Sequence, residues 1–166
     1  IVVIIGLLTH GYAFFDAAFT HDALNALYAD PVENEWKISL GRFCKPIYQI
    51  LIRGEFAVPW LIGCLSLLWI AIAVYLVVGM FEISSWIGVA LISGMMVTNL
   101  TVILTAATYI YDLDANMFAL MLSALAAYRW NKNLRIDLLA ILCISISLGF
   151  YQAYVSVCIV LMLMRC

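Results

Sequence analysis

The chain has 166 residues, of which 67% are hydrophobic and 11% are charged, and its formal net charge at pH 7 is −2. Soluble domains are about 45–50% apolar and about 25% charged, so this composition excludes a soluble globular protein and indicates a polytopic membrane protein. No basic run is present, so nothing points to a nucleic-acid partner.

Long apolar segments predict an all-α fold with about five transmembrane helices and short interfacial helices in a long first outer loop. A hydrocarbon layer of roughly 30 Å requires about 20 apolar residues per helix. The predicted spans are 1–15, 60–81, 86–107, 113–130 and 138–164, and the loop covers 16–59. Because the chain starts and ends in apolar runs, we interpret 1–166 as a single transmembrane domain from a longer protein.

Two of these spans have additional features. The segment 138–164 would reach about 40 Å at 1.5 Å per residue, so it must tilt or bend, and Gly149–Gln152 is the predicted bend. The span that begins at Trp86 carries a stripe of small and hydroxyl residues, which usually marks a helix–helix contact; a substrate path is the alternative. The stripe consists of Gly94, Thr98, Thr101, Thr105 and Thr108, with Asn99 beside it.

The main polar interruption, residues 9–59, contains six of the 10 acidic and four of the 8 basic residues. Ionisable groups concentrated on one side of a membrane protein indicate a functional site. Residues 20–29 predict a short helix that ends before Pro31. Residues 36–53 are amphipathic, with a break expected at Lys45–Pro46 because proline disrupts a helix interior. We expect the basic face of this segment to meet phosphates in the headgroup layer.

The order of the spans determines which loops lie together. Since each span changes the side of the membrane, the loop 9–59 and the polar segment 109–116 must share one face. The turns 82–85 and 131–137 share the other. The positive-inside tendency would place the second face in the cytoplasm, although the first loop also contains bases and nearly balances the count. The bases of the second face are Arg129, Lys132 and Arg135.

Acidic residues on the first face are candidates for chemistry. Asp16 and Asp22 lie in one polar segment, and Asp112 and Asp114 in the other. A partly desolvated carboxylate can act as a general base, and two carboxylates can hold a divalent cation such as Mg²⁺ or Mn²⁺. The alternatives are that Asp114 caps a helix starting at Ala115 and that Asp112 is a solvated loop residue.

Arg42 and Lys45 are candidates for binding an anionic group, the arginine through two hydrogen bonds. The same basic face would equally suit plain lipid binding. His10 and His21 lack partners at metal-ligand spacing, and the five cysteines are irregularly spaced, so neither a zinc site nor a disulfide framework is predicted.

Two functional classes fit these features. One is a membrane enzyme acting on a lipid-linked substrate, and the other is a transporter or flippase-like protein for a lipid-linked or small polar substrate. Transporters usually bury ionisable groups at mid-span. The cores of the second, third and fourth predicted spans contain no charge, which favours the enzyme.

Four short motifs then suggest a family. They are Thr20–Leu24, with Asp22 at its centre, Gly41–Arg42, Tyr109–Asp114 and Ser147–Ala153. In this order and spacing they resemble the N-terminal part of the bacterial glucosyltransferases that modify O-antigen, the serotype-converting type often carried by prophages. The resemblance covers nearly the whole chain.

The resemblance implies a GT-C class polytopic glycosyltransferase of the bacterial inner membrane, with its active site facing the periplasm or the cell exterior. It implies a polyprenyl-phosphate-linked sugar, typically glucose, as donor and a cell-surface glycan such as O-antigen of lipopolysaccharide as acceptor. It also implies an essential acid in the first outer loop, which maps to Asp22, with Asp16 competing for that role. The expected substrate-binding residues are Arg42, Lys45, Asp112, Asp114, Tyr151 and Gln152.

Overall fold

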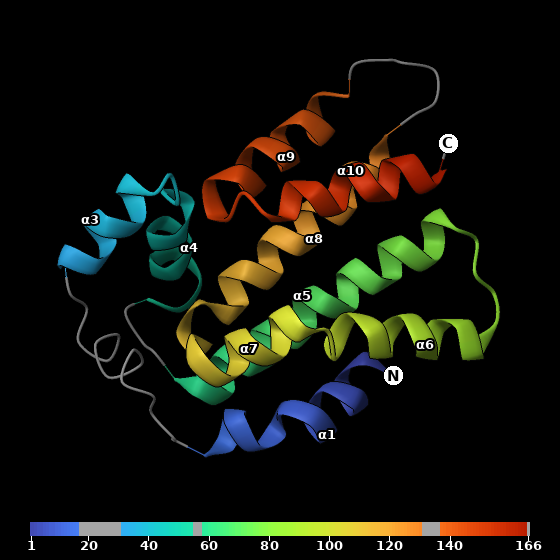
Figure 1. The fold of residues 1–166 in the computed structure, drawn as a ribbon, viewed down its shortest axis with the longest axis horizontal. Helices are drawn as coiled ribbons and strands as arrows, with labels where there is room; N and C mark the ends of the chain where they lie inside the picture. Colours follow the sequence, from blue (N-terminus) through green and yellow to red (C-terminus); the bar gives the residue numbers. More distant parts are fainter. Residues whose placement is uncertain (17–30, 55–57, 131–136, 166) are drawn as a thin grey trace.

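The computed structural model describes residues 1–16, 31–54, 58–130 and 137–165, with 31–34 described by their backbone alone. All regular structure in these ranges is helical, which confirms the predicted all-α class (Figure 1). The predicted helix over 20–29 lies outside the described residues. The described elements are α1 (Val2–Phe15), α3 (Pro31–Ser39), α4 (Cys44–Arg53), α5 (Pro59–Met80), α6 (Trp86–Val97), α7 (Leu100–Thr108), the 3-10 turn η1 (Ile110–Asp112), α8 (Leu113–Arg129), α9 (Leu138–Phe150) and α10 (Tyr154–Arg165).

Helices α5 and α8 set the length of the bundle. α5, with 22 residues, and the η1–α8 segment, with 20, are long and apolar enough to cross a membrane. α6 and α7 pass the same test together as one span bent by 43°, and the described α1, α9 and α10 are shorter apolar helices. The five predicted spans therefore correspond to two full-length helices, one bent pair and three shorter helices, which is consistent with a polytopic membrane protein.

Helix α8 forms the centre of the bundle. It packs against α5, α9 and α10, and nearly all of its side chains are buried. Alanines at 115, 119, 126 and 127 are fully buried, and such small residues let neighbouring helices approach closely. The Ser147 hydroxyl lies 2.9 Å from the Ser123 hydroxyl and donates to the Ala119 carbonyl at 3.0 Å, so these polar groups are satisfied within the bundle.

The bend between α6 and α7 is stabilised by side chains. Asn99 accepts a hydrogen bond from the Val102 amide at 3.0 Å and so caps α7. The Val97 carbonyl, at the end of α6, accepts a hydrogen bond from His10 Nε2 at 2.9 Å. His10 is therefore a buried, hydrogen-bonded histidine that ties α1 to the bend.

The polar stripe along α6 and α7 does not form the expected helix–helix contact. Thr98 and Thr101 are exposed, and the Thr98 and Thr105 hydroxyls donate to carbonyls one turn earlier in their own helices. Thr101 and Thr105 instead line a pocket. The preferred interpretation of this stripe is therefore wrong.

The chain reverses direction between α9 and α10, where a single last span was expected (Figure 1). Arg165, at the end of α10, donates to the carbonyls of Tyr128 and Trp130 at the end of α8, at 2.9 and 2.7 Å. The prediction of a single span over 138–164 is therefore wrong, whereas the break at 151–153 overlaps the predicted bend at Gly149–Gln152. At 13 residues, α9 is about 20 Å long, too short to cross the hydrocarbon layer alone.

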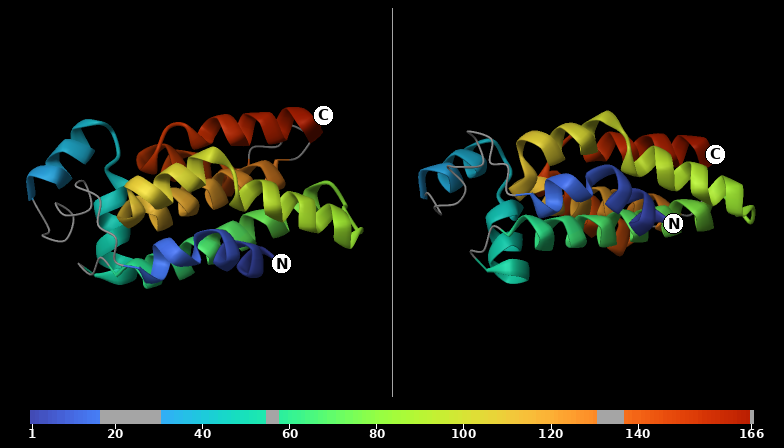
Figure 2. Two further views of the ribbon diagram at one scale, coloured as in Figure 1. Left: turned by 60° about the horizontal axis from the view of Figure 1, so that its bottom comes forward. Right: turned by 90° about the horizontal axis from the view of Figure 1, so that it is seen from below.

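Helices α3 and α4 project at one end of the bundle (Figure 2). Pro31 and Pro46 both occupy first turns, where the missing amide hydrogen removes no helical hydrogen bond. The break between the two helices therefore lies at 40–43 rather than at Lys45–Pro46. Gly41 adopts the left-handed conformation there, with φ 79°.

Helix α4 turns its basic face inward. Lys45 and Arg53 are 1% and 8% exposed, whereas Ile50 and Leu51 are 64% and 76% exposed. The expectation that these bases face lipid headgroups is therefore wrong. The basic face instead packs toward the start of α8, and the apolar face points away from the bundle.

Candidate active site

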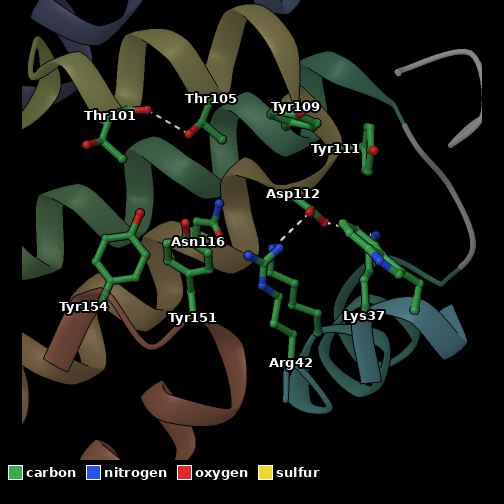
Figure 3. A pocket seen from close by; sticks show the side chains of 12 residues that line it. Lys37, Arg42, Thr101, Thr105, Tyr109, Tyr111, Asp112, Asn116, Tyr151 and Tyr154 are labelled. Carbon is green, nitrogen blue, oxygen red and sulfur yellow. Dashed lines mark hydrogen bonds and ion pairs between the residues drawn. The ribbon is translucent and has the colours of Figure 1, made fainter. Parts of the chain in front are cut away.

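A pocket of about 320 Å³ opens at the end of the bundle that carries α3 and α4 (Figure 3). Its walls come from α3, α4, α7, the start of α8 and the turn between α9 and α10. The loop 9–59 and the segment 109–116 thus meet at one end, as the order of the spans predicted. The charged lining residues are Lys37, Arg42, Lys45 and Asp112.

Asp112 is the centre of the charged network. Its two carboxylate oxygens accept hydrogen bonds from Lys45 Nζ at 2.9 Å and Lys37 Nζ at 3.3 Å, and Gln49 Nε2 donates at 3.3 Å. Asp112 is 6% exposed, so it is not an ordinary solvated loop acid. Three donors from α3 and α4 converge on this carboxylate and fix both helices at the mouth of the pocket.

Lys45 is the more deeply buried of the two lysines that contact Asp112. Burial lowers the pKa of its ammonium group, while the charge and hydrogen bond of Asp112 act in the opposite direction. The neighbouring charges of Arg42 and Lys37 lower this pKa further. An anion bound in the pocket would oppose these effects and stabilise the charged lysine.

Arg42 lies against an aromatic face. Its guanidinium carbon is 4.5 Å from the centre of the Tyr151 ring, and its buried Nε has no hydrogen-bond partner among the described residues. Gln152 Nε2 donates to the Leu40 carbonyl at 3.0 Å and so ties the α9–α10 turn to the break before Arg42. The structure therefore brings Arg42 and Tyr151 together in the pocket, whereas Gln152 supports its wall from outside.

Asp114 lies behind the pocket and does not line it. It is fully buried, and its Oδ2 is 3.4 Å from Arg53 Nε. Arg53 Nη2 also donates to the Tyr111 carbonyl. Since Asp114 is the second residue of α8, it does not cap a helix that starts at Ala115. Its contact with Arg53 instead joins α4 to α8.

The two aspartates do not face a common cation. Asp112 contacts lysines and Asp114 contacts an arginine, and the described residues contain no cluster of three His, Cys, Asp or Glu side chains that could hold a metal ion. The described part of this end therefore presents cationic rather than metal-ligating groups to the pocket.

Asp16, one of the two candidate bases, is not among the described residues that line the pocket. Asp16 is exposed at the end of α1, where its amide donates to the Tyr12 carbonyl at 2.8 Å. Asp22 and His21 lie outside the described residues.

Sequence reasoning missed several residues that build the site. Lys37 carried no signal beyond being a single base in a polar segment. An aromatic cluster packs α4 against α5 and α8. Tyr48 of α4 stacks on Phe118 of α8 with ring centres 5.1 Å apart, and its hydroxyl accepts a hydrogen bond from Trp69 Nε1 of α5 at 2.8 Å. Aromatic residues in apolar helices are too common to be recognised as such a support from sequence.

The described residues of the pocket combine three basic side chains and one carboxylate with aromatic walls at the end of apolar helices. Comparison with known families shows to which family the chain belongs. Residues 11–166 match the family described as Glucosyl transferase GtrII. The chain belongs to this family. Comparisons with curated proteins and with solved structures give no match. Membership in the GtrII family confirms the resemblance to bacterial glucosyltransferases and identifies a membrane glycosyltransferase, which requires a sugar donor and a glycan acceptor.

Proposed function

We propose that this GtrII-family protein transfers glucose from a polyprenyl-phosphate donor to a cell-surface glycan such as O-antigen. The reaction would take place on the extracytoplasmic face of the bacterial inner membrane, by the GT-C type of chemistry. The observation that carries the proposal is Arg42, a pocket cation without a carboxylate partner in the described structure. In the proposed complex, the donor phosphate is that partner.

The charge balance of the pocket supports an anionic ligand. Among the described residues, the charged side chains that line it are Lys37, Arg42, Lys45 and the carboxylate of Asp112. Positive charge in a partly buried site is costly unless it is paired, so a bound anion would stabilise this arrangement. A phosphate suits the site because a guanidinium group can bind two of its oxygens while a lysine binds as a point charge.

The position of the pocket supports a lipid-linked donor. It lies at the end of α5 and α8, the two described helices long enough to cross a membrane. The exposed apolar face of α4 lies at the same end. A phosphate attached to a membrane lipid reaches the protein at this depth, where the hydrocarbon layer gives way to the headgroups.

The proposed step is a displacement at the anomeric carbon. The acceptor hydroxyl oxygen forms a bond to that carbon as the bond from the carbon to the phosphate oxygen breaks, and the electron pair leaves with the lipid phosphate. The acceptor proton passes to a carboxylate base, for which we propose Asp22, with Asp16 as the alternative. Arg42 and Lys45 stabilise the charge on the departing phosphate, and Asp112 holds the lysines in position.

The test is sugar transfer from polyprenyl-phosphate glucose in membranes that contain the full-length protein. We expect Arg42→Gln to lower transfer by roughly 10- to 100-fold, because one charged contact to the leaving phosphate is lost. Arg129→Gln, which removes an exposed guanidinium at the opposite end, is the matched control and should retain transfer. Full transfer by Arg42→Gln at normal expression would refute the phosphate assignment.

The same assay tests the base. Asp22→Asn should abolish transfer, and Asp16→Asn should retain it; the reverse result would assign the base to Asp16.

A second experiment separates the enzyme from a transporter. Detergent-solubilised protein, across which no gradient exists, should still consume the donor if it is an enzyme.

A further inference from the structure

Besides its basic residues, the pocket is lined by residues with buried polar atoms that have no hydrogen-bond partner in the described structure. These are Asn116 Oδ1 and the Tyr154 hydroxyl, in addition to Arg42 Nε. Asn116 and Tyr154 are 9% and 7% exposed. Buried polar atoms are nearly always hydrogen-bonded, so two unpartnered atoms in one pocket indicate a ligand that forms hydrogen bonds with them.

The positions of the two residues relate them directly to the charged network. Asn116 follows Asp112 by four residues, so it lies on the same face of the helix about 6 Å further along the axis. Tyr154 begins α10, and its ring centre is 5.9 Å from that of Tyr151, on which Arg42 stacks. Figure 3 shows Asn116 and Tyr154 beside Tyr151, facing the threonines of α7.

The chemistry of these atoms restricts the ligand. The phosphodiester of the proposed donor offers only acceptors and cannot satisfy a carboxamide oxygen, and an isoprenoid chain offers neither donors nor acceptors. A sugar hydroxyl both donates and accepts, so it can pair with either end of the Asn116 amide and with the Tyr154 hydroxyl. The aromatic lining, which includes Tyr109 and Tyr151, provides apolar surface for the faces of a ring.

We propose that Asn116 and Tyr154 bind hydroxyl groups of the hexose ring of the donor and thereby determine which sugar is accepted. This inference rests on the proposed function, since it places the sugar beside a phosphate held by Arg42 and Lys45. A site built to bond a hydroxyl discriminates strongly against an analogue that lacks it, because the protein groups are then left unpaired.

The experiment measures equilibrium binding of glucose 1-phosphate and of inorganic phosphate to purified full-length protein in detergent. Wild type should bind glucose 1-phosphate more tightly than phosphate. Tyr154→Phe, which removes only the hydroxyl, and Asn116→Ala should each weaken glucose 1-phosphate binding by about threefold to tenfold and leave phosphate binding unchanged. Tyr75→Phe removes a hydroxyl from a side chain of α5 that is 76% exposed, and it should change neither.

The outcomes separate this inference from the proposed function. If Arg42→Gln weakens both ligands but Tyr154→Phe and Asn116→Ala bind glucose 1-phosphate like wild type, the sugar site is refuted and the phosphate site stands. Equal loss of both ligands in the two variants also refutes the sugar site. If wild type binds neither ligand, both the phosphate site and the sugar site are refuted.

A second measurement on wild type alone does not depend on the folding of any variant. Monodeoxy analogues of glucose 1-phosphate are compared with the parent compound, and at least one should bind about threefold to tenfold more weakly. Equal binding of all analogues to wild type would overturn the inference.

Discussion

At the pocket end of the bundle, Lys37, Lys45 and Asp112 form ion pairs in which no side chain is more than 9% exposed. At the opposite end, Arg129 and Asp137 form an ion pair of the same 2.9 Å length as the Lys45–Asp112 pair, but the Arg129 side chain is 49% exposed. Water screens the exposed pair, whereas the buried network has lost its hydration. Equal distances at the two ends therefore correspond to different energies.

The difference indicates why the buried charges are present. An exposed ion pair contributes about 0–1 kcal/mol, and a buried one often stabilises a fold no better than apolar side chains of the same size. The charges at the pocket end are thus poorly explained by stability alone. They are well explained by the proposed function, in which these cations bind an anionic donor.

The largest effect should come from removing the central carboxylate of the buried network. Asp112→Asn removes the carboxylate that Lys37 and Lys45 both contact, and it takes from the buried Lys45 ammonium group its counter-charge. We therefore expect the free energy of unfolding to fall by about 3–5 kcal/mol. Denaturant titration of the full-length protein in mixed micelles measures the change. Asp137→Asn is the matched control at the opposite end, because asparagine still caps α9, and it should cost less than about 1 kcal/mol. Equal losses in the two variants would remove the distinction between the ends.

A smaller effect is expected from the second buried pair. Arg53→Met leaves the Asp114 carboxylate without its counter-charge, but this group can take up a proton, so the loss should be about 2–3 kcal/mol. The double variant Arg53→Met with Asp114→Leu should recover most of that loss, because an apolar pair can replace a buried ion pair. A double variant with the summed loss of the two single variants would show that the residues act independently.

The smallest effect should occur at the exposed end. Arg129→Gln removes one half of a solvent-screened pair, and we expect a change within about 0.5 kcal/mol in the same titration. Added salt should reduce even this difference. A loss comparable to that of Arg53→Met would mean that exposure is a poor guide to the energy of these pairs.

Much of the architecture could be predicted from the sequence because apolar length and the alternation of sides are strong constraints. They correctly located the helices at 59–80 and 113–129, and they placed the segments that contain Lys45 and Asp112 at the same end. The reversal after Phe150 could not be predicted, since an apolar run of 27 residues reads the same whether it continues or folds back. Only the residues at 151–153 distinguish a continuous span from a helical hairpin, and we interpreted them as a bend within one span.

The site was predicted less completely for a related reason. Periodicity showed that 36–53 has a basic and an apolar face but not which face contacts the bundle, and the interior carboxylates that decide this are remote in sequence. Asn116 and Tyr154 were missed because a neutral polar residue in or beside an apolar segment usually forms its hydrogen bonds within its own helix. Their lack of partners is visible only once the neighbouring helices are in place.

The reversal between α9 and α10 also redistributes the positive charge of the chain. A fifth crossing would have placed Arg165 beside the pocket, against the cytoplasmic preference of basic residues. The hairpin instead brings it to the carbonyls at the end of α8, beside Arg129, while Lys45 and Arg53 at the other end are neutralised by aspartates. Arg129, which pairs with Asp137, and Arg165, whose partners are backbone carbonyls, therefore both lie at the end away from the pocket. We expect this bias to orient the protein during insertion, with the Arg165 end retained in the cytoplasm and the pocket delivered to the outer surface.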